Sequence, residues 1–391
     1  MILNQITLIN FRNYSKISVD LCNKINILIG DNAQGKTNIL ESIYVLGITK
    51  SHRAVIDNNL IKENESFCKI KGNIETKNLS RNLEFFLSGK EKKVFINKNQ
   101  VKKLTDYISK FNIIIFTPDD LELVKGSPNV RRKFLNIEIG QIDNKYLNIL
   151  NDYNKLLKTR NEYLKQLNPK NLNNKLIEVL NERIIDKALY IYEKRFEFIE
   201  LINSKITDIY IDITNDDNLK IKYVNNLGIE KFDKDYIKNI LFEKLNINLE
   251  REIVLGQTLF GPHKDDFTFI LNDNDVKSYG SQGQQRTCIL SLKLSEIYIF
   301  VEKTKENPIL LLDDIFSELD DTKKNNIIKY INKNIQTIIT TTDLNQINKE
   351  LLKDSYIYKI ENGNVERLMI ENESRTLWCV GYSSIRRVRG S

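Results

Sequence analysis

The chain has 391 residues, 41% hydrophobic and 28% charged, a composition typical of a globular protein with room for two domains. No apolar run approaches the roughly 20 residues of a membrane span, and the N-terminus lacks the basic and apolar segments of a secretory signal, so we expect a cytoplasmic protein with no membrane partner. The formal net charge of +7 gives only mild support for an anionic partner, and four scattered cysteines with two histidines exclude a recognisable zinc site.

The N-terminal part is predicted to form strands on both sides of a glycine-rich turn. Apolar and polar residues alternate over 6–10 and 17–21, and the apolar run 25–29 leads directly into Gly30. A helix is expected after this turn, because the apolar residues that follow recur on one face. Further strands are expected at 83–87, 94–97 and 112–116.

The middle of the chain is predicted to be helical. Apolar residues recur at spacings of three and four over 146–167 and 177–202, and 168–171 (Asn-Pro-Lys-Asn) breaks the pattern. This pattern predicts an antiparallel helical hairpin, in which Arg160 and Arg195 interrupt the apolar seam.

Helices and strands alternate in the last third of the chain. The apolar runs 308–312 and 337–340 are typical of buried parallel strands. Because a sheet that begins before residue 30 resumes after residue 305, the helical segment is expected to be an insertion in one α/β domain.

The turn after residue 29 carries a phosphate-binding motif. Its sequence, Gly30-Asp31-Asn32-Ala33-Gln34-Gly35-Lys36-Thr37, matches GxxxxGK[ST] between a predicted strand and a predicted helix. The glycines allow backbone N–H groups to surround phosphate oxygens. Lys36 is expected to contact the β- and γ-phosphates and Thr37 to bind Mg²⁺, so the motif predicts a nucleoside triphosphate site.

A second part of such a site follows the apolar strand that ends at residue 312. Asp313 is expected to hold Mg²⁺ through water, and Asp314 to orient or deprotonate the attacking water. Taken alone, an aspartate at this place is as often the cap of the next helix. The glycine-rich motif upstream favours the metal site.

The loop 279–286 is rich in glycine, serine and glutamine and opens a predicted helix. In isolation such a loop is more often a turn. Ser281 in this loop lies 32 residues before Asp313, where ABC-type ATPases have their signature loop. The residues that align with the SGGQ part of that signature are Ser281, Gln282 (replacing a glycine), Gly283 and Gln284.

These and other segments together resemble the RecF family, bacterial recombinational repair ATPases that belong with SMC-type chromosome proteins. The matching segments occur in family order from residue 5 to about residue 345. They are 8–14, 30–37, 51–53, 116–121, 124–128, 131–132, 261–266, 281–286, 310–320 and 340–343.

The resemblance implies an α/β fold, with an ABC-type P-loop ATPase head and an inserted, mainly helical second domain. We expect the head at 1–116 and 255–370 and the insert at 117–254. Residues 371–391 match nothing in the family and are expected to be an unstructured or unrelated tail.

The same resemblance implies a function in DNA replication and recombinational repair. It implies an ATP-dependent homodimer that hydrolyses ATP slowly with Mg²⁺ across its interface. It also implies binding to gapped DNA, duplex DNA and single-strand/duplex junctions. The implied partners are RecR, RecO and RecA, the last of which is loaded onto DNA.

Site residues follow from the resemblance as well. The signature-like loop would act in trans, on the nucleotide of a second copy, and the roles stated above are implied for Lys36, Thr37, Asp313 and Asp314. Arg12 and Asn13 match a position that contacts nucleotide in SMC-type relatives, although Arg12 fits a surface residue of the first strand equally well.

The chain departs from the ABC pattern in two places. Residues 117–119 (Thr-Pro-Asp) stand where a Q-loop glutamine is expected, and 342–343 (Thr-Asp) stand in place of a switch histidine. Both departures disfavour the nucleotide-binding subunit of a membrane transporter, although an ABC-type subunit of another assembly stays an alternative. A small-molecule kinase would not explain the signature-like loop, and an SMC-like structural protein would need a longer helical insert.

Contacts to DNA are predicted only weakly. The basic clusters 90–93, 102–103 and 131–133 are candidates, although each is more often a solvated face. Because no base-reading motif is present, we expect binding directed mainly at phosphates.

Overall fold

The computed structural model describes residues 1–168, 175–214, 218–319, 321–331, 335–347, 349–353, 355–370, 377–381 and 384–387. The chain forms two compact units, one made of Met1–Asp120 and Glu296–Ser391 and the other of Leu121–Ser295. In the described part of the chain, no helix has both the length and the apolar character needed to cross a membrane.

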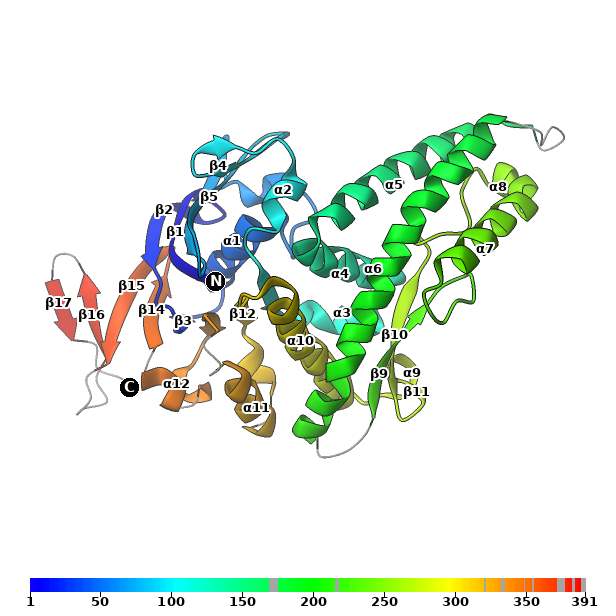
Figure 1. Cartoon of the computed structure of the whole chain (residues 1–391). Coiled ribbons are helices and arrows are strands. Elements are labelled where there is room, and N and C mark those ends of the chain that lie inside the picture. Colours follow the sequence, from blue (N-terminus) through cyan, green and yellow to red (C-terminus); the bar gives the residue numbers. More distant parts are fainter. Residues whose placement is uncertain are drawn as a thin grey trace. The chain divides into compact units, whose positions relative to one another are not determined.

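The first unit is built around an eight-stranded sheet (Figure 1). Its strands, in spatial order, are β17 (Ser384–Arg387), β16 (Leu377–Gly381), β15 (Asn364–Ile370), β14 (Ser355–Glu361), β3 (Ile25–Ile29), β13 (Thr337–Thr341), β12 (Ile309–Asp313) and β8 (Ile113–Phe116). The strands β14, β3, β13, β12 and β8 run parallel. Every residue of β8, β12 and β13 is buried, as expected for a parallel sheet covered on both faces.

A six-stranded antiparallel sheet forms the other layer of this unit. Its order is β2 (Tyr14–Asp20), β1 (Ile2–Phe11), β4 (Cys68–Glu75), β5 (Ser80–Ser88), β6 (Glu91–Ile96) and β7 (Asn99–Gln100). Helix α1 (Lys36–Ile48) packs against β4 and β5 of this sheet and against β12 and β13 of the larger one (Figure 1). It is buried on nearly all sides, which explains why it is almost uniformly apolar after its first turn.

Shorter helices complete the first unit. They are η1 (Asp57–Leu60), α2 (Leu104–Ile108), η3 (Ile315–Glu318), α11 (Asp321–Ile331), η4 (Leu344–Gln346) and α12 (Lys349–Lys353). Two elements cross the division between the units, η2 (Pro118–Leu121) and α10 (Gln282–Thr304).

The second unit consists mainly of helices, as predicted. The hairpin is formed by α5 (Asn144–Leu164) and α6 (Lys175–Thr214), which pack along each other, and α6 extends well beyond the predicted 177–202 (Figure 1). The remaining elements are α3 (Glu122–Lys125), α4 (Pro128–Ile142), α7 (Lys234–Ile247), α8 (Leu249–Leu255), α9 (Val276–Tyr279) and the three-stranded sheet of β11 (Asn274–Asp275), β10 (Asp266–Leu271) and β9 (Leu219–Val224).

The two arginines that interrupt the predicted seam are both buried and both paired. Arg160 lies 2.7 Å from Glu252 of α8, and both side chains have an exposed fraction of 0%. Arg195 lies 3.1 Å from the carboxylate of Asp265 and also donates to the carbonyl oxygen of Pro262. Each arginine therefore ties the hairpin to the chain that returns after it.

The boundaries of the units differ from the expected ones on the C-terminal side. Residues 255–295, expected in the ATPase domain, belong to the second unit, because β10 pairs with β9 in its small sheet and β9 packs on α6.

Part of the stretch that was expected to be an unstructured or unrelated tail is structured, which corrects only the first of these two alternatives. Within 371–391, β16 pairs with β15 and β17 pairs with β16, so these two segments extend the large sheet. The other residues of that stretch lie outside the described part of the chain.

Candidate nucleotide-binding site

The glycine-rich motif forms the turn between β3 and α1, as predicted. Gly35 has a φ of 112° and Ala33 a φ of 64°, so the turn uses left-handed backbone at two places. The ammonium of Lys36 donates to the carbonyl oxygens of Gly30 at 2.6 Å and Asp31 at 2.9 Å. Burial lowers the pKa of Lys36, although the carboxylates around it act in the opposite direction.

Neighbouring turns hold this motif tightly. Asn13 donates to the carbonyl oxygen of Gln34 at 3.3 Å, and the hydroxyl of Tyr14 donates to that of Gly35 at 3.1 Å. A Cβ atom on Gly35 would lie 2.6 Å from the Tyr14 hydroxyl oxygen, so a side chain has no room there. From the turn after β14, the backbone N–H of Asn362 donates to the side chain of Gln34 at 2.6 Å. The sequence motif gave no sign of Tyr14 or Asn362 as supports.

The rest of the motif is open to solvent. Asp31, Asn32 and Ala33 are exposed, whereas Gly35 and Lys36 are buried. Backbone N–H groups near the start of α1 are the ones that such a turn presents to an anion.

The two acidic residues lie directly beside the motif. The hydroxyl of Thr37 donates to Oδ1 of Asp313 at 3.0 Å, and the hydroxyl of Thr340 donates to the same oxygen at 2.7 Å. The backbone N–H of Asp314 donates to the Thr340 hydroxyl oxygen at 2.9 Å. The structure therefore brings Thr37 and Asp313 together as predicted, and it adds Thr340, which the sequence marked only by its place at the end of a predicted strand and in the matching segment 340–343.

Asp314 stands at the position that precedes η3, where the alternative interpretation placed a helix cap. Its backbone is left-handed, with a φ of 51°, and within the described residues its side chain makes no capping hydrogen bond to η3. Capping therefore does not account for this carboxylate.

The oxygen atoms gathered here have the chemistry that Mg²⁺ prefers. A threonine hydroxyl and an aspartate carboxylate are hard oxygen ligands, and Mg²⁺ in phosphate sites takes its other ligands from phosphates and water. Among the residues that the structure describes, no group of three or more His, Cys, Asp or Glu side chains could hold a metal by itself. Thr37 and Asp313 thus fit a Mg²⁺ ion that is completed by a nucleotide.

Arg12 is tied to the helix that follows the motif. Its guanidinium donates to the Glu41 carboxylate of α1 at 2.7 and 2.8 Å, and the Ser51 hydroxyl donates to the same carboxylate. Burial alone would raise the pKa of Glu41. These hydrogen bonds and the charge of Arg12 instead hold that pKa below its ordinary value. The side chain of Arg12 is 23% exposed, so it is neither a free surface residue nor fully enclosed.

The signature-like loop lies in the second unit, at the start of α10. The Ser281 hydroxyl accepts from the N–H of Gln284 at 3.3 Å, and the Gln284 side chain accepts from the N–H of Ser281 at 2.9 Å. This reciprocal pair is a capping box. Ser281, Gln282 and Gly283 are nevertheless exposed, and a Cβ atom on Gly283 would meet only the Ser281 hydroxyl, at 4.0 Å. Among the described residues of this unit, none comes close enough to require glycine at that position.

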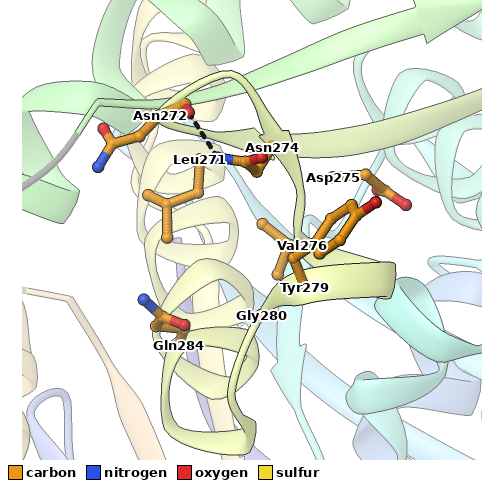
Figure 2. A pocket seen from close by; sticks show the side chains of 8 residues that line it. All are labelled: Leu271, Asn272, Asn274, Asp275, Val276, Tyr279, Gly280 and Gln284. Atoms are coloured by element: carbon orange, nitrogen blue, oxygen red, sulfur yellow. Dashed lines mark hydrogen bonds between the residues drawn. The ribbon is translucent and has the colours of Figure 1, made fainter.

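A small hollow adjoins this loop. Figure 2 shows it between the turn after β10 and the end of α9, with a volume of about 160 Å³. It is lined by Leu271, Asn272, Asn274, Asp275, Val276, Tyr279, Gly280 and Gln284. Tyr279, on its rim, is 78% exposed.

Known proteins show which family combines these features. The model of the RecF/RecN/SMC N-terminal domain family matches residues 2–365. The DNA replication and repair protein RecF of Bacillus cereus (strain G9842) is 42% identical over 369 residues, which cover 94% of this chain and 98% of the relative. The chain belongs to the RecF family.

Solved structures agree with this assignment. The recombination mediator protein RecF with ATP, from the RecFOR pathway, matches with a TM-score of 0.87 and 33% identity, over 94% of this chain and 98% of that one. The Smc head domain of Pyrococcus furiosus matches with a TM-score of 0.52 and 15% identity, over 95% of this chain and 97% of that one, a likeness of fold alone. The predicted ABC-type α/β head is therefore confirmed.

Two positions of the ABC pattern are filled differently in this RecF-family chain. After β8, the N–H of Thr117 donates to the carboxylate of Asp120 at 2.7 Å. After β13, the Thr341 hydroxyl donates to the carbonyl oxygen of Asp343 at 2.9 Å and accepts from its N–H at 3.2 Å. Both places are closed turns that carry neither glutamine nor histidine.

The basic clusters of this RecF-family chain are partly internal. Lys92 donates to the carbonyl oxygen of Thr49 at 2.9 Å and lies 2.7 Å from the carboxylate of Asp57. In the second unit, the guanidinium of Arg131 binds the carboxylate of Asp266 at 2.6 and 2.8 Å, and Arg132 donates to the carbonyl oxygen of Asp265. Lys92 and Arg131 are thus engaged by these bonds, and contact of the three clusters with DNA stays a prediction.

Proposed function

We propose that this chain is an ATPase of DNA replication and recombinational repair, which binds ATP with Mg²⁺ and hydrolyses it slowly. The observation that carries the proposal is the meeting of Lys36, Thr37 and Asp313 beyond the carboxyl ends of β3 and β12, two strands of one sheet that both flank β13. The solved RecF relative that binds ATP supports the choice of nucleotide.

Each residue of the site has a task in this proposal. The N–H groups of residues 30–37 bind phosphate oxygens, and Lys36 turns from the carbonyl oxygens of its own loop to the β- and γ-phosphates. Thr37 and Asp313 hold Mg²⁺, which supplies positive charge against the phosphates. Asp314 orients or deprotonates the attacking water. Asn13 keeps the turn in shape, and Arg12 supports it through Glu41.

ATP drives dimerisation in this proposal. The loop of Ser281, Gln282, Gly283 and Gln284, whose first three residues are exposed, contacts the nucleotide of a second copy. Two features support this contact. The described residues of its own unit do not require a glycine at position 283, and Ser281 is exposed although it is part of a capping box. Hydrolysis across the interface then releases the dimer, so that ATP acts as a switch.

The dimer acts on DNA together with other repair proteins. We infer binding to gapped and duplex DNA and to single-strand/duplex junctions, with RecR and RecO as partners in loading RecA. The names of the relatives, a DNA replication and repair protein and a recombination mediator of the RecFOR pathway, support this inference.

Light scattering of the full chain, with and without ATP and Mg²⁺, tests the central step. Asp314→Asn is used to block turnover, and we expect it to be a stable dimer with ATP and a monomer without it. Lys36→Arg is the matched control, because a guanidinium does not replace the compact ammonium in the cradle. A monomeric Asp314→Asn chain at saturating ATP, or an unaffected Lys36→Arg chain, contradicts the proposal.

DNA binding is tested separately with gapped, duplex and single-stranded substrates, with and without ATP and RecR. Binding directed at phosphates releases counterions, so affinity should fall steeply between low and physiological salt. An affinity that does not change with salt would contradict a phosphate-directed contact.

A further inference from the structure

The hydroxyl of Thr340 connects the two acidic residues of the site. It donates its proton to Oδ1 of Asp313 at 2.7 Å and accepts the backbone N–H of Asp314 at 2.9 Å. Thr340 is fully buried at the carboxyl end of β13, directly opposite Asp313 in the ladder that pairs β13 with β12. A hydroxyl has one proton and two acceptor sites, so these two bonds are mutually compatible.

Both bonds act on groups that the proposed reaction uses. The Asp313 oxygen that Thr340 binds is the one that also accepts from Thr37. Asp314 has left-handed backbone, with a φ of 51°, a conformation that costs free energy for most residues with a side chain and that aspartate adopts occasionally. The hydrogen bond from its N–H to the Thr340 hydroxyl fixes the backbone of the turn at this point. The backbone in turn determines the position from which the Asp314 side chain extends.

We propose that Thr340 is a positioning residue for ATP hydrolysis, which fixes the Asp313 carboxylate toward Thr37 and the Asp314 backbone in its left-handed turn. The proposal rests on the function proposed above. Thr340 contacts neither water nor phosphate in it and acts through the two aspartates. It stands on the strand whose end carries a switch histidine in ABC-type ATPases and carries Thr342-Asp343 here.

The same strand offers a matched control. Thr337 is also fully buried on β13, but its hydroxyl donates to the carbonyl oxygen of Ile335 at 3.1 Å, at the other end of the strand. Thr337→Val and Thr340→Val remove the same atoms from similar surroundings. A general loss of strand stability would affect both variants, whereas a loss of positioning affects only Thr340→Val.

The first experiment needs no nucleotide. Amide hydrogen exchange of the full chain reports the N–H of Asp314, which loses its acceptor in Thr340→Val and keeps it in Thr340→Ser. We expect faster exchange at 313–314 in Thr340→Val, with wild-type exchange there in Thr340→Ser and Thr337→Val. Wild-type exchange at this segment in Thr340→Val would overturn the proposal.

The second experiment separates turnover from binding. Loss of a residue that hydrogen-bonds to a metal ligand typically lowers metal affinity or activity by about 10–100-fold. We expect kcat for ATP to fall by about that factor in Thr340→Val and to return in Thr340→Ser, with KM for ATP changed much less. Equal kcat in Thr340→Val and wild type overturns the proposal, as does an equal loss in Thr337→Val. If wild type neither binds nor hydrolyses ATP, the proposed function fails, while the exchange experiment still decides whether the hydroxyl holds the turn.

Discussion

The hydroxyl of Thr37 donates to Oδ1 of Asp313 at 3.0 Å, although 276 positions separate the two residues in the chain. The contact is possible because β3 and β12 both flank β13, so that their carboxyl ends lie at one edge of the sheet. Two sequence motifs, each of which could be explained without a functional site, therefore form one oxygen-lined site.

Replacing the Thr37 hydroxyl should weaken ATP binding only where Mg²⁺ takes part. We expect Thr37→Val to lose at least about tenfold in affinity for a fluorescent ATP analogue with Mg²⁺, and far less when Mg²⁺ is chelated. Thr37→Ser keeps the hydroxyl and is the control. An equal loss with and without Mg²⁺ would show that the side chain supports the fold of the turn and not the metal.

The signature-like loop allows its local role to be separated from its proposed role in trans. Ser281→Ala removes the helix cap and should cost about 0.5–2 kcal/mol of stability, whereas Ser281→Asp and Ser281→Asn restore a capping side chain. We expect all three variants to lose ATP-dependent dimerisation, measured by light scattering, because none presents the serine hydroxyl. Recovery of dimerisation in Ser281→Asn would mean that only the cap matters.

The sequence predicted the parts of this site that depend on local pattern. The turn 30–37 and the strand that ends at Asp313 are short-range signals, because glycine, lysine and threonine spacing and an apolar run suffice to recognise them. The supports Tyr14 and Thr340 come from two separate strands and Asn362 comes from the turn after β14, so their contacts can be recognised only once the sheet order is known. No periodicity in one sequence specifies that order.

The helical insert shows the same limit. The seam of α5 and α6 was recognisable, but Arg160 and Arg195 stood out as unexplained breaks. Their partners, Glu252 and Asp265, lie on segments that no pattern connects to the hairpin. For the same reason the second boundary of the insert was placed too early: β10 belongs to a small sheet whose other main strand, β9, follows the hairpin.

The Arg160–Glu252 pair gives a stability prediction. Both side chains have an exposed fraction of 0%, so Arg160→Met leaves a carboxylate buried without its partner. We expect the free energy of unfolding to fall by about 3–5 kcal/mol, measured by urea denaturation. Arg160→Met combined with Glu252→Gln removes the unpaired charge and should recover part of that loss. A double variant less stable than Arg160→Met would contradict this account of the pair.

His263 gives a prediction about pH. Its Nε2 lies 3.1 Å from the carbonyl oxygen of Thr258, so Nε2 carries the proton, and Nδ1 accepts from the Tyr153 hydroxyl at 2.6 Å. Both nitrogens are thus committed in the neutral ring. Burial lowers the pKa of His263 to about 4, and the positive charges of Lys264, Arg132 and Arg195 act in the same direction.

Between pH 4 and 6.5 the unfolded chain therefore binds more protons at this position than the folded chain, and its contribution to stability rises with pH. Burial raises the pKa of Asp265 to about 6, which gives the opposite slope over much of the same range. Because the two slopes are opposite, the pH dependence of the wild-type stability alone would not reveal the contribution of either residue. The informative quantity is the difference in unfolding free energy between wild type and His263→Gln.

Asp265 contributes equally to both chains, so its effect cancels in this difference. The difference in unfolding free energy should therefore increase in favour of the wild type by up to about 1.4 kcal/mol for each pH unit between pH 4.5 and 6, the value for one proton. Urea denaturation of the full chains at several pH values measures it. His263→Gln keeps a side chain that can hydrogen-bond but does not titrate, so a change at all pH values alike would report only altered packing. A difference that stays constant across this range would show that His263 is protonated alike in the folded and unfolded chains.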